Sequence, residues 1–136
     1  MCWARAEIMK LYEGEDWYLQ LDSHHRFTRD WDEKLVAQAL LTGSTKPVLT
    51  TYAAGFTPGA EADAAELVTT MEFDRFTAEG LLLPKPAVAT EARVAPIRAR
   101  FLSAHFLFAA GSFVQDLPHD PELWLTVPSV ARSAPH

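Results

Sequence analysis

An aspartate and a histidine stand one residue apart at the end of an apolar run, and together they could bind a metal ion. Asp22 and His24 follow the segment 17–21, whose side chains are apolar except for one glutamine. Alternate residues of an extended chain point to the same side, so Asp22 and His24 can present one oxygen and one nitrogen to a single ion. This donor pair suits a borderline divalent metal such as manganese better than calcium.

Arg26 lies two residues further on, and its planar fork of donors could reach a phosphate bound to such a metal. An alternative interpretation is a polar turn after a strand, in which Asp22 caps local backbone groups and the histidines are solvated. A third possibility is a small metal-dependent hydrolase that uses Asp22, His24 and His25. An isolated D-x-H pattern is short, so it does not by itself decide among these alternatives.

The segments before this pair predict a helix followed by a buried strand. Apolar residues at positions 4, 8, 11 and 12 recur at helical spacing, and Gly14 is a suitable helix end. The nearly continuous apolar run 17–21 is typical of a buried strand, as in a parallel sheet. Ligands of open α/β sheets sit beyond the carboxyl ends of the strands, which is where Asp22 stands.

A second helix is predicted after Asp22. Asp30 is expected as its N-cap, Glu33 completes a capping-box pattern, and Gly43 ends the helix. Further strands are expected at 47–52, 71–76 and 101–109. The order helix, strand, helix, strand at the start of the chain favours an α/β layer architecture.

The prolines at positions 84, 86 and 96 interrupt the chain between the last two of these strands. Proline cannot donate a backbone hydrogen bond and restricts the residue before it. We therefore expect extended or looping pieces in this region.

Composition narrows the class of protein. The 136 residues are enough for one domain, and a net charge of −6 argues against nucleic acid as the main partner. No apolar run approaches the roughly 20 residues of a membrane helix, and the N-terminus lacks the apolar stretch of a secretory signal. Cys2 is the single cysteine, which fits a reducing compartment. A soluble, cytoplasmic protein is expected.

Several spaced runs of residues extend the D-x-H pattern over most of the chain. They are Cys2-Trp3-Ala4-Arg5, Tyr18-Leu19-Gln20-Leu21-Asp22-Ser23-His24, Arg26-Phe27, Trp31-Asp32, Lys46-Pro47-Val48-Leu49-Thr50-Thr51-Tyr52, Phe101-Leu102-Ser103-Ala104-His105-Phe106-Leu107-Phe108-Ala109 and Asp120-Pro121-Glu122-Leu123. In this order they resemble the glycosyltransferases related to the cytoplasmic hydroxyproline N-acetylglucosaminyltransferases.

The resemblance implies a GT-A fold, a Rossmann-like mixed α/β sheet flanked by helices. It also implies transfer of N-acetylglucosamine from UDP-N-acetylglucosamine to a protein or small-molecule hydroxyl, with retention of configuration. Asp22 and His24 would form the family's metal motif, a D-x-H form of D-x-D that holds manganese. The remaining site residues that it implies are Ser23 and Arg26 at the donor diphosphate, and Ser103 and His105 on the sugar and acceptor side.

The same resemblance implies a truncated member of the family. Residues 1–125 would be the central part of a GT-A domain, and residues 126–136 a divergent C-terminal tail. The family's domain begins with nucleoside-binding strands upstream of Cys2, and it continues beyond Leu123 into a segment that completes the active site. The alternative is a non-catalytic remnant, or a module that binds nucleotide sugar and metal without turnover. Sheet edges exposed by missing strands also predict self-association.

Overall fold

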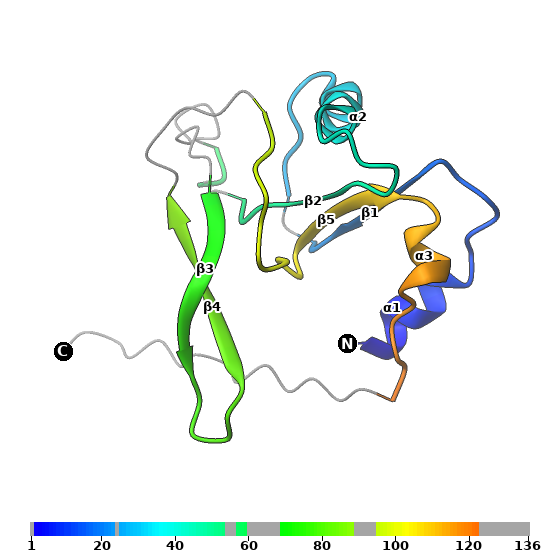
Figure 1. Cartoon of the computed structure of the whole chain (residues 1–136). Coiled ribbons are helices and arrows are strands. Elements are labelled where there is room, and N and C mark those ends of the chain that lie inside the picture. The colour runs from blue at the N-terminus through cyan, green and yellow to red at the C-terminus, as the bar shows by residue number, and fades with distance from the viewer. Residues whose placement is uncertain (1, 24, 54–56, 60–68, 89–94, 123–136) are drawn as a thin grey trace.

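The computed structural model describes residues 2–23, 25–53, 57–59, 69–88 and 95–122 (Figure 1). Helices and strands alternate in the first part of the chain, and the predicted α/β class is confirmed. The elements are α1 (Cys2–Met9), β1 (Trp17–Leu21), α2 (Trp31–Leu41), β2 (Val48–Thr50), β3 (Thr69–Phe76), β4 (Leu82–Val88), β5 (Phe106–Ala110) and α3 (Phe113–Asp116).

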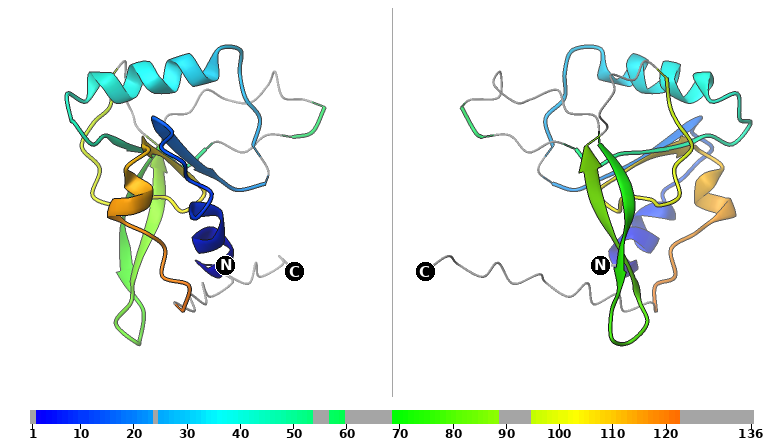
Figure 2. Two further views of the ribbon diagram at one scale, coloured as in Figure 1. Left: turned by 90° about the vertical axis from the view of Figure 1, so that its right-hand side faces the viewer. Right: turned by 60° about the vertical axis from the view of Figure 1, so that its left-hand side comes forward.

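The central sheet has the strand order β1-β5-β2 and is covered on both faces. Helix α2 lies over one face, and α1 and α3 lie on the opposite side (Figures 1 and 2). Phe108 in the middle of β5 pairs with Leu19 of β1 on one side and with Leu49 of β2 on the other. The middle of β5 is buried, since Leu107, Phe108 and Ala109 are at most 6% exposed.

Strand β1 confirms the predicted strand, but it is mostly half-buried rather than buried, and its neighbours are not those expected. Both β1 and β2 run antiparallel to β5 within the described residues, so the apolar run does not belong to a parallel pair there. The run is apolar because alternate side chains point to opposite faces of the sheet, and other elements pack on both faces. Trp17 stacks on Phe108 on the α2 side, whereas Tyr18 stacks on Phe113 of α3 on the other side.

Helix α2 begins where it was expected, with Asp30 in the predicted N-cap position, but the side-chain capping bond is absent. Asp30 has a left-handed backbone with φ 56° and makes no side-chain capping bond. Its carboxylate lies instead 3.6 Å from the Arg29 side chain. The Phe27 ring packs on Trp31 at the helix start, with ring centroids 4.4 Å apart. The predicted end is confirmed, because the helix stops at Leu41 and Gly43 follows with φ 66°.

Helix α1 presents a different face to the sheet than its spacing suggested. Ala6 and Met9 are buried, whereas Ile8 and Leu11 are 60% and 74% exposed. The helix ends at Met9, before Gly14. The helix is apolar on more than one side, and only the side that carries Ala6 and Met9 is buried.

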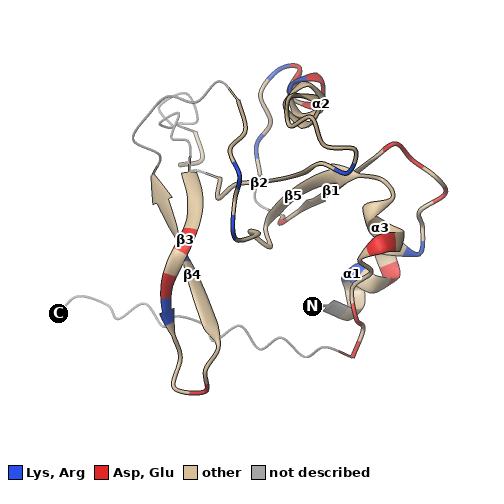
Figure 3. Cartoon of the chain, viewed as in Figure 1, with Lys and Arg blue, Asp and Glu red and all other residues tan. Residues whose placement is uncertain are grey.

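Strands β3 and β4 form a separate two-stranded hairpin beside the central sheet (Figures 1 and 3). Residues 82–88, where extended or looping pieces were expected, are extended and form the regular strand β4 in spite of Pro84 and Pro86. These prolines stand two residues apart, so their ring nitrogens lie on one side of the strand, and β3 pairs with the other side. The chain is irregular from Pro96 to residue 100, as expected, but the strand predicted over 101–109 begins only at Phe106.

Candidate functional site

The strand end that carries Asp22 meets the ends of two other strands. The Asp22 N–H donates to the His105 carbonyl at 3.2 Å, and the Ala53 N–H donates to His105 Nε2 at 3.1 Å. Residues 20–22, 50–53 and 103–106 thus form one structure, which we call the Asp22 junction. It lies at the carboxyl ends of β1 and β2, where β5 begins.

Ser103 and His105, the predicted substrate-lining residues, both lie in this junction. Because His105 Nε2 accepts the Ala53 N–H, its proton sits on Nδ1, which donates to Ser103 Oγ at 2.7 Å. Ser103 is 3% exposed, and its N–H donates to Thr50 Oγ1 at 2.8 Å. The Tyr52 ring meets His105 edge-on, 4.3 Å away. The hydrogen bonds of Ser103 and His105 therefore connect the ends of the strands to one another.

Asp22 presents its carboxylate beside this structure. The side chain is 39% exposed, and Oδ1 lies 3.4 Å from Nη2 of Arg5. A carboxylate offers about four lone-pair sites, so one long hydrogen bond leaves oxygen available for a metal. The chemistry of Asp22 therefore fits the predicted metal role. His24, the other half of the predicted pair, lies outside the described residues.

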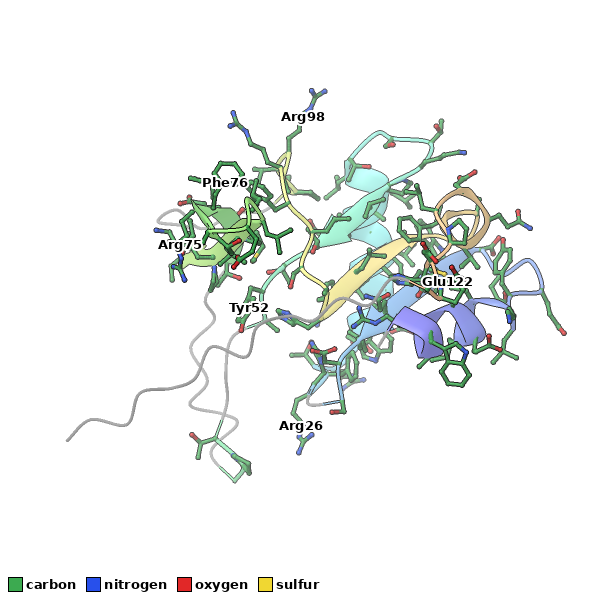
Figure 4. All side chains as sticks on the ribbon, turned by 90° about the horizontal axis from the view of Figure 1, so that it is seen from below. Arg26, Tyr52, Arg75, Phe76, Arg98 and Glu122 are labelled. Atoms are coloured by element: carbon green, nitrogen blue, oxygen red, sulfur yellow. The ribbon has the colours of Figure 1, made fainter. Side chains whose placement is uncertain are left out.

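The two residues expected at the donor diphosphate follow Asp22 at the surface. Ser23 is exposed, and Arg26 extends away from the sheet (Figure 4). One Arg26 nitrogen, Nη1, donates to the carbonyl of His25 at 3.2 Å. The structure thus brings Asp22, Ser103 and His105 together, and it turns the Arg26 side chain outward.

His25 helps to shape the loop after β1. Its Nδ1 donates to the Asp22 carbonyl at 2.9 Å, and its ring lies 5.9 Å from that of His105. Within residues 2–23, 25–53, 57–59, 69–88 and 95–122, no group of three His, Cys, Asp or Glu side chains is arranged to hold a metal. The hydrolase alternative with Asp22, His24 and His25 gains no support from the residues that the structure describes.

A polar network lies on the α1 side of the junction, and the sequence patterns did not predict it. Gln20 is 8% exposed, and its Nε2 donates to the Ala104 carbonyl at 2.8 Å. Its Oε1 accepts hydrogen bonds from His119 Nε2 at 2.9 Å and from the Tyr18 hydroxyl at 3.4 Å. The one feature of the sequence that could have indicated this network is Gln20, the single polar residue within the apolar run 17–21.

The ionisation of this network follows from its burial. Burial, and secondly the nearby charge of Arg5, lower the pKa of His119 below its ordinary 6.5. Burial raises the pKa of Tyr18, and the charge of Arg5 opposes that rise. Both side chains are therefore uncharged at neutral pH and suited to donate to Gln20.

Two grooves border the central sheet. A groove of about 730 Å³ extends from Thr50 and Phe106 of the junction toward Thr69, with Arg98 and Arg100 on its wall. A second groove, of about 630 Å³, is mostly apolar and lies between α2 and the sheet beside Trp17. The first groove reaches Thr50, Thr51 and Phe106 of the junction, whereas Asp22, Ser103 and His105 are not among the residues that line it.

The architecture and the site define an α/β protein with polar side chains gathered at the ends of three strands. The family model described as Glycosyltransferase (GlcNAc) matches residues 1–126, which is nearly the whole chain. The chain therefore belongs to this glycosyltransferase family. No curated protein and no solved structure matches the chain significantly. No helix in the described part of the chain is both long and apolar enough to cross a bilayer.

Proposed function

We propose that this protein transfers N-acetylglucosamine from UDP-N-acetylglucosamine to a hydroxyl group, with retention of configuration and with the help of manganese. The observation that carries this proposal is the family match over residues 1–126, with Asp22 at the end of β1 inside that match. The acceptor would be a protein or small-molecule hydroxyl. The acidic composition and the single cysteine support action in the cytoplasm.

Asp22 and His24 would hold the metal in this proposal, with the half-exposed carboxylate of Asp22 as its oxygen ligand. When bound, manganese would neutralise the charge that develops on the departing nucleotide diphosphate. Ser23 and Arg26 would contact that diphosphate, which requires the Arg26 side chain to turn inward from its present direction. Ser103 and His105 would shape the sugar and acceptor side by holding the turn 103–106 in place.

Titration of UDP into the protein, with and without manganese, tests the donor site. We expect UDP binding to depend on manganese and to weaken by about tenfold or more in Asp22→Asn, because a metal ligand is lost. Asp16→Asn is the matched control, since Asp16 is exposed and stands just before β1, where Asp22 stands just after it. Equal binding by the wild type and Asp22→Asn would contradict the assignment.

A transfer and hydrolysis assay with UDP-N-acetylglucosamine distinguishes the enzyme from the alternative, a module that binds nucleotide sugar and metal without turnover. Manganese-dependent turnover that is lost in Asp22→Asn would support the enzyme. Binding without turnover, for a range of hydroxyl acceptors, would support the module.

Self-association also stays a proposal. Among the described strands of the central sheet, β1 and β2 form the two edges, and each leaves one side of its backbone unpaired. Light scattering at several protein concentrations would measure it, and a constant monomer mass would exclude it.

A further inference from the structure

Arg5 reaches from α1 to the Asp22 junction and contacts two of its elements. Its side chain is only 17% exposed. The same nitrogen, Nη2, lies 3.1 Å from the Ala104 carbonyl oxygen and 3.4 Å from Asp22 Oδ1. One guanidinium therefore joins the helix, the turn before β5 and the carboxylate at the end of β1.

Gln20 donates to the same carbonyl. Because the Ala104 carbonyl can only accept, the Gln20 amide must turn its nitrogen toward Ala104 and its oxygen toward His119. His119 Nε2 is then the donor, and the backbone N–H of His119 donates to Met9 Sδ of α1 at 3.4 Å. The orientation of the Gln20 amide is thus determined at both ends.

The turn 103–106 is consequently tied to the end of β1 at two successive carbonyls. The Ala104 carbonyl accepts from Arg5 and Gln20, and the His105 carbonyl accepts from the Asp22 N–H. A buried polar side chain such as Gln20 costs free energy unless it is hydrogen-bonded, and an apolar residue would fill β1 more simply. The network therefore does more than fill the space beside β1.

We propose that Arg5 and Gln20 are positioning residues for Asp22: they hold the Ala104 turn and the carboxylate in the geometry that a metal needs. This rests on the proposed function, in which Asp22 is a metal ligand. Partners that hydrogen-bond a ligating carboxylate and its surroundings typically contribute tenfold to a hundredfold to metal affinity. Arg5 acts through Asp22, since its guanidinium is largely covered and already engaged with Ala104.

Titration with manganese alone, without nucleotide, tests this role. We expect the manganese affinity to fall by about tenfold in Arg5→Ala and in Gln20→Leu. The affinity of Arg5→Lys should lie between those of wild type and Arg5→Ala. Lys10→Ala is the control, because it removes an exposed cation of the same segment that pairs with Glu7 instead. Unchanged or tighter manganese binding in Arg5→Ala would overturn the proposal. A loss confined to UDP affinity would also overturn it, because Arg5 would then contact phosphate.

Amide hydrogen exchange provides a readout that does not depend on metal. The Asp22 amide should exchange about tenfold faster in Arg5→Ala, while the amide of Phe108 in the middle of β5 stays at the wild-type rate. If wild type bound no manganese, the metal part of the proposed function would fail, and the Asp22 amide would still decide whether Arg5 positions this residue. Equal protection of that amide in both proteins would contradict the positioning role.

Discussion

At the Asp22 junction, hydrogen bonds join residues that are 52 to 99 positions apart in the chain, from Ala53–His105 to Gln20–His119. The β3–β4 hairpin instead pairs residues of one continuous segment, 69–88. Its charged residues also pair nearby, since Asp74 lies close to Arg75 and Lys85. Polar side chains thus hold distant segments together at the junction, whereas the ion pairs of Asp74 join residues within the hairpin.

Few of the described contacts attach the hairpin to the rest of the molecule. Among the described contacts, Thr69 at the start of β3 accepts from the Tyr52 N–H at 3.1 Å and donates to the Tyr52 carbonyl. Phe73 and Phe76 on the same strand are 47% and 59% exposed. We therefore expect changes in the central sheet, at the junction or at the other end of β5, to lower the stability of the whole sheet, and changes in the hairpin to remain local.

Two glycines give the largest expected contrast. A Cβ added at Gly111, just after β5, would lie 1.8 Å from the Glu15 carbonyl oxygen, so the backbone must shift. Gly111→Ala should cost about 3 kcal/mol of unfolding free energy, whereas Gly80→Ala in the hairpin turn has open space and should cost about 1 kcal/mol for its φ of 82°. Urea unfolding followed by tryptophan fluorescence measures both; equal losses would contradict the contrast.

A smaller effect is expected from the polar side chains themselves. His105→Ala removes the acceptor of the Ala53 N–H and leaves the buried Ser103 hydroxyl without its donor, which should cost about 2 kcal/mol. Thr69→Val removes the hydroxyl that links β3 to Tyr52 and should cost about 1 kcal/mol. Amide exchange should quicken throughout the central sheet in the first variant and within residues 69–88 in the second. The opposite distribution would show that the hairpin supports the junction.

The smallest effect concerns pH. Because folding lowers the pKa of His119, the unfolded chain takes up a proton at a higher pH than the folded chain does. The stability that the neutral ring contributes is present above 6.5 and is lost as the pH falls through the lowered folded value. The urea midpoint should therefore fall between about pH 8 and about pH 5, and it should fall less in His119→Asn. An equal fall in both proteins would exclude His119 as the source.

Much of the α/β order could be predicted from local patterns. The apolar run 17–21 and the helical spacing before and after it identify α1, β1 and α2, because burial of apolar side chains depends on periods that the sequence contains. The glycine after α2 marks its end for a local reason as well, the left-handed backbone at Gly43. The motifs around Asp22, Ser103 and His105 also pointed to one site, and these residues meet at one end of the sheet.

Other features depend on which segments meet, and no local pattern contains them. The capping pattern at Asp30 was misleading because the backbone there is left-handed, and Pro84 stands in a strand because only one side of β4 is paired. The roles of Arg5 and Gln20 arise only when α1, β1 and the turn 103–106 converge on one carbonyl oxygen. The sequence by itself indicated α1, β1 and α2 through periodicity and Asp22 through its chemistry, and the family resemblance added Ser103 and His105. The tertiary structure decided their partners, because a hydrogen bond between distant residues requires the whole sheet to have formed.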